Sequence, residues 1–126
     1  MSASGVDPGE LLALASRLAV QAGDAALAGR RRAGRPSLSA DTKSTATDLV
    51  TVYDHAAESL VVEGIRSARP HDAIIGEEGT DHDGTSGVSW YIDPIDGTTN
   101  FVYDLPLWST SVAAADADGG VARAVY

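Results

Sequence analysis

The sequence has no cysteine, so disulfide bonds and thiolate-ligated metal sites are excluded. Basic residues are also scarce: nine lysines and arginines stand against 18 aspartates and glutamates, giving a formal net charge of −9. Nucleic acids and anionic membranes would repel such a chain, so neither is expected as a partner. A small phosphorylated molecule remains compatible with this charge if cations mediate the contact.

Long uninterrupted apolar runs are missing as well. Charges such as Arg17 and Asp24 break the longest apolar stretch, so no membrane-spanning segment is expected. The first seven residues have neither a basic start nor an apolar core, which argues against a signal peptide. These absences predict a cytoplasmic protein, and 126 residues suffice for one domain.

Helical spacing of apolar residues predicts two helices. The first begins with Asp7 as N-cap and Pro8 at the first helical position. It ends with the arginines at positions 30–32, which are interpreted as a solvated helix end. The second is predicted from Thr51, where residues 51–54 have the form of a capping box, to about Ala68. The predicted apolar faces are Leu11, Leu14, Ala15, Leu18, Ala22 and Ala26 in the first helix, and Val52, Ala56, Leu60, Val61 and Ile65 in the second.

Short apolar runs predict four strands, over residues 73–75, 88–92, 108–115 and 121–126. Residues 34–44 are predicted as a loop or short strand, 79–87 as a polar loop and 116–120 as a turn. By pattern alone these elements indicate an α+β fold.

The run Trp-Tyr-Ile-Asp-Pro-Ile-Asp-Gly-Thr-Thr-Asn-Phe at residues 90–101 is the most informative part of the chain. Asp93 and Asp96 stand three apart at the end of an apolar strand. Pro94 has no N–H to donate, so it is expected to end the hydrogen-bond ladder there. The two carboxylates can then converge on one side of the bend, with the Ile95 carbonyl between them. All three ligands are hard oxygens, which favours Mg²⁺ over Zn²⁺.

The residues that follow suit an anion. Gly97 permits close backbone approach, and the N–H groups of Gly97, Thr98 and Thr99 can face a phosphate at a helix start. A strand end with a helix-capping aspartate is the alternative explanation. Carboxylates and free N–H groups in one short stretch favour a metal and phosphate site.

Other candidates are less specific. Glu77 and Glu78 are neighbours after a strand, so only one of them can point into such a site, and periodicity does not choose between them. Asp54 could equally cap the second helix. Lys43, the only lysine, is of a type more often found on the surface. Residues 81–83, Asp-His-Asp, are predicted to be solvated.

The chain resembles the inositol monophosphatase family of Mg²⁺-dependent phosphatases. The resemblance covers nearly all of the chain from Leu11 onward. Its motifs, in order, are Lys43, Asp48-Leu-Val-Thr51, Asp54, Gly76-Glu77-Glu78 and Asp93-Pro-Ile-Asp-Gly-Thr-Thr-Asn-Phe101. A haloacid-dehalogenase-type phosphatase also has Asp-Gly-Thr, but it needs aspartates two apart and is rejected.

The resemblance implies an α/β layered sandwich, of which residues 1–126 form the N-terminal part: two helices and part of a mostly antiparallel sheet. It implies two or three Mg²⁺ ions and hydrolysis of a phosphate monoester by metal-activated water. The implied metal ligands are Glu77, Asp93, the Ile95 carbonyl and Asp96. The implied catalytic residues are Glu77, Thr98 and Asp54, with Gly97, Thr98 and Thr99 at the phosphate and Lys43 in support near the metals.

The implied substrate is inositol 1-phosphate. Histidinol phosphate, a 3′-phosphonucleotide and fructose 1,6-bisphosphate are the alternatives. Thr99 favours inositol phosphate, because some histidinol-type relatives have lysine there. The resemblance also implies inhibition by Li⁺ and a homodimer in the full-length form.

Two positions depart from the family pattern. Tyr53 stands where the family usually has a smaller residue, often threonine, and Asp104 stands where it often has glycine. The family also continues beyond this length, and a later Trp-Asp motif supplies a further carboxylate. Residues 1–126 alone are therefore expected to be truncated, nearly inactive and poorly soluble. The alternative from another functional class is an inactive metal-binding fragment.

Overall fold

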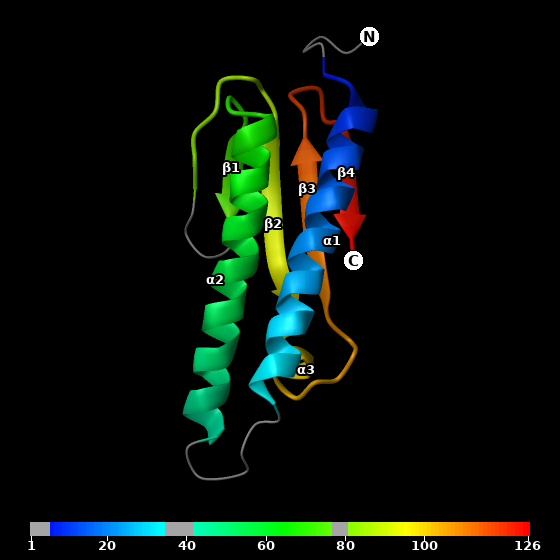
Figure 1. Ribbon diagram of the computed structural model, residues 1–126. Helices are drawn as coiled ribbons and strands as arrows, with labels where there is room; N and C mark the ends of the chain where they lie inside the picture. Colours follow the sequence, from blue (N-terminus) through cyan, green and yellow to red (C-terminus); the bar gives the residue numbers. More distant parts are fainter. Residues whose placement is uncertain (1–5, 35–41, 77–80) are drawn as a thin grey trace.

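The computed structural model describes residues 6–34, 42–76 and 81–126, and of residues 42–51 it describes only the backbone helix. Two long helices lie side by side across one face of a four-stranded sheet (Figure 1). This is the predicted α/β layering. The elements in chain order are α1 (Pro8–Ala33), α2 (Thr42–Ala68), β1 (Ala73–Gly76), β2 (Ser89–Asp96), α3 (Thr98–Val102), β3 (Ser109–Ala115) and β4 (Val121–Val125).

The sheet has the strand order β1-β2-β3-β4. β1 runs parallel to β2, whereas β2–β3 and β3–β4 are antiparallel, so the prediction of a mostly antiparallel sheet is confirmed. A turn over residues 116–120 joins β3 to β4 as predicted, with the Asp116 N–H donating to the Gly120 carbonyl at 2.9 Å.

α1 forms as its sequence predicts. The Asp7 side chain caps it by accepting from the Gly9 N–H at 2.8 Å, and Pro8 occupies the first turn. All six residues of its predicted apolar face are buried. By length and composition alone α1 could cross a membrane, contrary to the expectation that its charges exclude such a segment. The core helix of a soluble protein has the same composition, and the apolar face of α1 packs in the main core.

α2 differs from its prediction at the start. The helix begins at Thr42, so the predicted boundary at Thr51 is wrong and Lys43 lies within the helix rather than in a loop. Residues 51–54 are interior, and their resemblance to a capping box has no structural role. Apolar residues between positions 46 and 50 continue the helix upstream of that local signal.

The buried face of α2 is also rotated from the predicted one. Val61 and Ile65 are buried as predicted, whereas Val52 is 60% exposed and Ala56 is exposed. The helix instead turns Ala57, Val62 and the side chains of Asp54 and Glu58 inward. The buried polar positions were unexpected because an apolar-face argument assigns charged residues to solvent.

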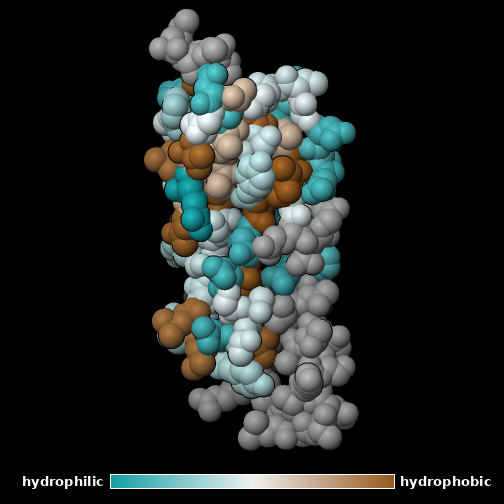
Figure 2. All heavy atoms as spheres, turned by 180° about the vertical axis from the view of Figure 1, so that it is seen from behind, coloured by the Kyte–Doolittle hydropathy of each residue, from teal (hydrophilic) through white to brown (hydrophobic). Residues whose placement is uncertain are grey.

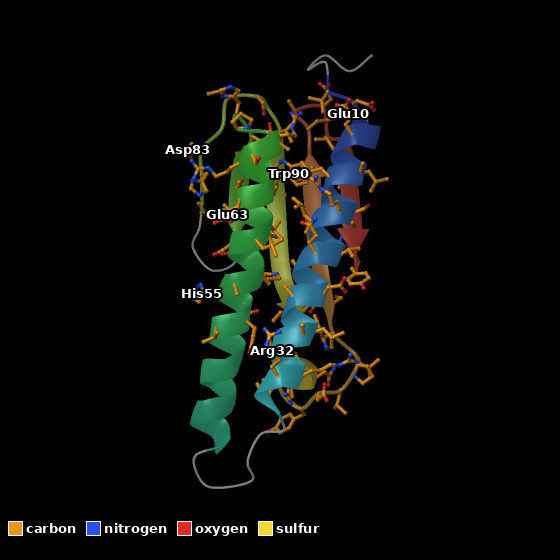
Figure 3. The ribbon with its side chains drawn as sticks, viewed as in Figure 1. Glu10, Arg32, His55, Glu63, Asp83 and Trp90 are labelled. Atoms are coloured by element: carbon orange, nitrogen blue, oxygen red, sulfur yellow. The ribbon has the colours of Figure 1, made fainter. Side chains whose placement is uncertain are left out.

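Trp90 of β2 is fully buried in the layer between the helices and the sheet (Figure 3). Its Nε1 donates to the Asp72 carboxylate at 2.8 Å, which satisfies the indole N–H. Asp72 also accepts from the Ser86 hydroxyl at 2.6 Å and forms an ion pair with Arg69. This buried network joins the start of β1 to β2.

The opposite face of the sheet carries Ile75, Tyr91, Asp93, Ala113 and Arg123. Hydrophobic and hydrophilic residues are interspersed on the side of the molecule away from the helices (Figure 2). These five residues help to line a cleft of about 400 Å³ on this face. The Arg123 guanidinium lies there and donates to the Ser111 hydroxyl at 3.1 Å.

The close approach of α1 and α2 gives a stability prediction. A Cβ on Gly29 would stand 2.1 Å from the Tyr53 ring, which is itself packed against Phe101 at 6.0 Å between centroids. Gly29→Ala is therefore expected to lower the free energy of unfolding by about 1–3 kcal/mol through overpacking. The measurement is chemical denaturation of the single and double variants. In a Tyr53→Thr background the same change should cost much less, and an equal cost in both backgrounds would contradict the contact.

Candidate functional site

The structure brings Asp93 and Asp96 to the same face of the sheet. Asp93 pairs with Ser111 and Asp96 with Ser109, so three steps along β2 match two steps along β3. The extra residue is a β-bulge. In a regular strand, residues three apart face opposite sides, but Ser109 and Ser111 share a face and so do their partners. The convergence of the two carboxylates is therefore a product of the bulge.

The expectation that the ladder ends at Pro94 is wrong. β2 continues to Asp96, and Pro94, which cannot donate, sits inside the bulge, where a donor is dispensable. The Pro94 carbonyl accepts from the buried Thr110 hydroxyl at 2.9 Å. This side-chain bond supports the bulge from β3.

Gly97 makes the turn from β2 into α3. Its φ is 91°, in the left-handed region, and a Cβ there would stand 2.8 Å from the Leu107 carbonyl. Both facts require glycine. α3 then begins as expected, with the Phe101 N–H donating to the Gly97 carbonyl at 3.0 Å. Thr98 and Thr99 are exposed in the first turn.

A small apolar cluster lies beneath this turn. It contains the buried side chains of Ala26, Ile95 and Phe101, with Tyr53 and Trp108 packed against them. Phe101 meets Trp108 edge-on with centroids 5.0 Å apart. Ile95 was predicted to offer its carbonyl as a ligand, and its side chain anchors the bulge in this cluster.

Asp54 is 8% exposed in the interior of α2, so helix capping does not account for it. It follows Tyr53, the α2 side chain that contacts Phe101 of α3. Asp54 is therefore adjacent in sequence to the α2 residue that contacts α3.

The remaining predicted site side chains lie outside the described residues. These are Glu77 with its neighbour Glu78, and the side chain of Lys43. Gly76, which precedes Glu77, pairs with Ile92 in parallel register, one residue before Asp93. Among residues 6–34, 52–76 and 81–126, no group of three or more acidic or histidine side chains is close enough together to hold a metal ion.

The loop before β2 is partly ordered by its own polar groups. Asp81 accepts from the Gly76 N–H at 3.2 Å, and the His82 backbone pairs with Ile74 at 2.9 Å. Asp83 points away from the molecule (Figure 3). The predicted solvation of residues 81–83 holds for the two aspartates, whereas His82 is only partly exposed.

Two clefts flank the loop that follows α3. One, of about 430 Å³, is lined by Asp96, Gly97 and residues 106–109. The other, of about 440 Å³, is lined by Asp104 and Arg31, among others. Asp104 is exposed with a φ of 59°, a left-handed conformation that glycine, the residue often found at this position in the resembled family, adopts without strain.

The prediction that arginines 30–32 form a solvated helix end is wrong for the first of them. Arg31 and Arg32 are exposed, but Arg30 is 1% exposed and its guanidinium bonds to carbonyls at the end of α3. Sequence reasoning missed this residue and Thr110. A basic residue in a last helical turn has an ordinary explanation in the helix dipole, and a threonine in a strand has one in β-propensity.

Comparison with known proteins places these features in context. Residues 7–126 match the model of the inositol monophosphatase family. The inositol-1-monophosphatase SuhB of Mycobacterium tuberculosis is 40% identical over 131 residues, covering 94% of this chain and 45% of that protein. A protein named Nus factor SuhB from Salmonella typhimurium is 48% identical over 67 residues, covering 52% of this chain and 25% of that protein.

Solved structures of inositol monophosphatases have a similar fold. Inositol monophosphatase-II of Staphylococcus aureus has a TM-score of 0.73 and 30% identity, covering 93% of this chain and 41% of that one. Inositol monophosphatase from Anabaena has a TM-score of 0.69 and 29% identity, covering 94% and 40%. The chain spans less than half the length of these relatives.

Proposed function

Because the chain belongs to the inositol monophosphatase family, we propose that it carries part of the active site of a Mg²⁺-dependent phosphatase acting on inositol 1-phosphate. The observation that supports this most is the bulge in β2. It places two carboxylates on one face, directly before a left-handed glycine and the start of α3. The proposed metal ligands and the proposed phosphate-binding backbone thereby lie in one continuous turn.

The donor set fits Mg²⁺. Asp93, Asp96 and the Ile95 carbonyl offer hard oxygens only, and the chain has no thiolate to favour a softer ion. Gly76, the residue before Glu77, pairs with Ile92, the residue before Asp93, and we propose Glu77 as a further ligand. Two or three ions are proposed. Bound Mg²⁺ neutralises phosphate charge and makes coordinated water more acidic.

Groups of the chain itself then position the phosphate and activate the attacking water. Glu77 Oε and the Thr98 hydroxyl orient the attacking water, and Glu77 accepts its proton. Asp54 is proposed, from the family resemblance, to act near Thr98 and to fix that hydroxyl. The N–H groups of residues 97–99 hold the phosphate, with Lys43 supporting the site by its charge.

The same family membership supports the proposed substrate and partners. Histidinol phosphate, a 3′-phosphonucleotide and fructose 1,6-bisphosphate are the alternative substrates. We propose a cytoplasmic enzyme, homodimeric in its full-length form. Direct contact with nucleic acid is disfavoured by the net charge of −9.

Phosphate release from inositol 1-phosphate tests the proposal. Activity is expected to require Mg²⁺, to vanish in a chelator and to fall with added Li⁺. The assay compares residues 1–126 with the longest in-frame polypeptide that contains them. Turnover in the chelator would exclude the metal mechanism, whereas indifference to Li⁺ would exclude only the close functional likeness to inositol monophosphatases. Activity in neither polypeptide favours the inactive metal-binding fragment.

A further inference from the structure

Arg30 is a buried cation at the end of α1. Its Nε donates to the carbonyls of Phe101 at 2.8 Å and Val102 at 3.0 Å. Its Nη1 donates to the Gly34 carbonyl, while Nη2 is buried without a hydrogen-bond partner among the described residues. The side chain thus joins α1 to the last two residues of α3 across 71 positions in sequence.

Burying this charge costs free energy, and among the arginines at positions 30–32 only Arg30 is buried. A charged group loses solvation on burial, and its described partners are backbone carbonyls rather than a carboxylate. Another arginine of the same helix end, Arg32, is exposed. Helix-dipole interaction is available to both residues, so it does not explain why Arg30 alone is buried.

The short helix α3, to which Arg30 donates, explains the burial of Arg30 better. α3 has five residues, about one turn, and a helix of that length is not stable by itself in water. The Thr99, Asn100 and Phe101 carbonyls accept from backbone N–H groups of residues 103–105, so these contacts are local to the loop that follows α3. Arg30 adds a contact from α1. The Phe101 ring packs against Tyr53 and Trp108, and these two contacts hold the side chain of that residue. Arg30 holds the backbone at a second point.

We propose that Arg30 is a positioning residue for the candidate site. By fixing the carbonyl end of α3, it fixes the direction of the other end, where Gly97 and Thr98 follow directly on Asp96. The inference rests on the proposed function for its effect on catalysis. Its structural half, that Arg30 holds α3 in place, stands independently.

Arg30→Met keeps the length and apolar stem of the side chain and removes its donors. Arg30→Lys restores one donor group and the charge. The matched control is Arg32→Met, which makes the same change at an exposed position of the same helix turn. Lysine also keeps the test informative if the methionine variant does not fold.

The first readout is amide hydrogen exchange in the longest in-frame polypeptide that contains residues 1–126. Exchange over residues 97–105 is expected to accelerate on the order of tenfold in Arg30→Met, with β3 and the main core unchanged. Arg30→Lys should be intermediate and Arg32→Met like the parent. Unchanged exchange in α3, or equal acceleration throughout the chain, would overturn the structural half.

The second readout is kcat and KM, measured well below the melting temperature in the polypeptide that carries the parent activity. A misdirected α3 should lower kcat on the order of 10- to 100-fold in Arg30→Met, with partial rescue by lysine. A parental kcat per folded molecule would show that Arg30 serves stability alone. A parent without activity would defeat the proposed function and with it the catalytic half, while the exchange result would still decide the structural half.

Discussion

Glu77→Gln is expected to lower kcat by about 10²–10⁴-fold, the range for loss of a general base, while Glu78→Gln leaves it near the parental value. The two residues are adjacent, and the parallel register that ends at Gly76 leads toward Asp93. The sequence predicts that these adjacent residues face opposite ways, so we expect a large difference between the matched variants. The measurement is kcat for phosphate release at saturating Mg²⁺.

The pair controls for the general effect of removing a negative charge at this point of the chain. Both substitutions change one acidic side chain to its isosteric amide. Equal losses in the two variants would contradict the assignment of faces, and a larger loss in Glu78→Gln would reverse it.

Asp96→Asn is expected to reduce activity by more than about 100-fold. Loss of a residue that only hydrogen-bonds to a metal ligand already costs about 10–100-fold in metal affinity or activity, and Asp96 is proposed as a ligand itself. Asp96 is exposed and its side chain lies outside both apolar clusters, so the melting temperature should stay close to that of the parent. A neutral amide is a weaker Mg²⁺ ligand than a carboxylate, so any residual activity should need more Mg²⁺ than the parent requires. At saturating Mg²⁺ kcat should still stay low, because the ion is no longer fixed in the productive position.

Asp83→Asn is the matched control, since Asp83 is exposed and points away from the molecule (Figure 3). It should leave both activity and stability unchanged. An active Asp96→Asn enzyme at saturating Mg²⁺ would remove Asp96 from the metal site.

The parts of the fold that were predictable are those with local causes. α1 carries its cap, its proline and a regular apolar stripe within its own sequence, and each feature is present in the structure. The start of α2 was mistaken because a capping pattern at residue 51 also occurs inside a helix that continues upstream. Its buried face was mistaken because Asp54 and Glu58 are buried by tertiary packing, which hydropathy alone cannot anticipate.

In the candidate site, too, features with local causes were predictable and features that depend on tertiary packing were not. The convergence of Asp93 and Asp96 on one face was expected, but the sequence suggested a strand end where the structure has a bulge. Thr110 and Arg30 act on partners 16 and 71 positions away. Contacts of that range depend on strand pairing and helix packing, so no nearby residue signals them.

The bulge also limits how the chain could be altered by insertion and deletion. Removing one residue between Asp93 and Asp96 would leave composition and hydropathy almost unchanged. It would give a regular strand with its aspartates two apart, both still on one face. The deletion would instead disturb the contacts around the strand. The Pro94 carbonyl would no longer lie opposite the Thr110 hydroxyl, and the turn into α3 would start one residue early. Transplanting this motif to another protein therefore requires the recipient sheet to supply a neighbouring strand with a hydroxyl at the matching position.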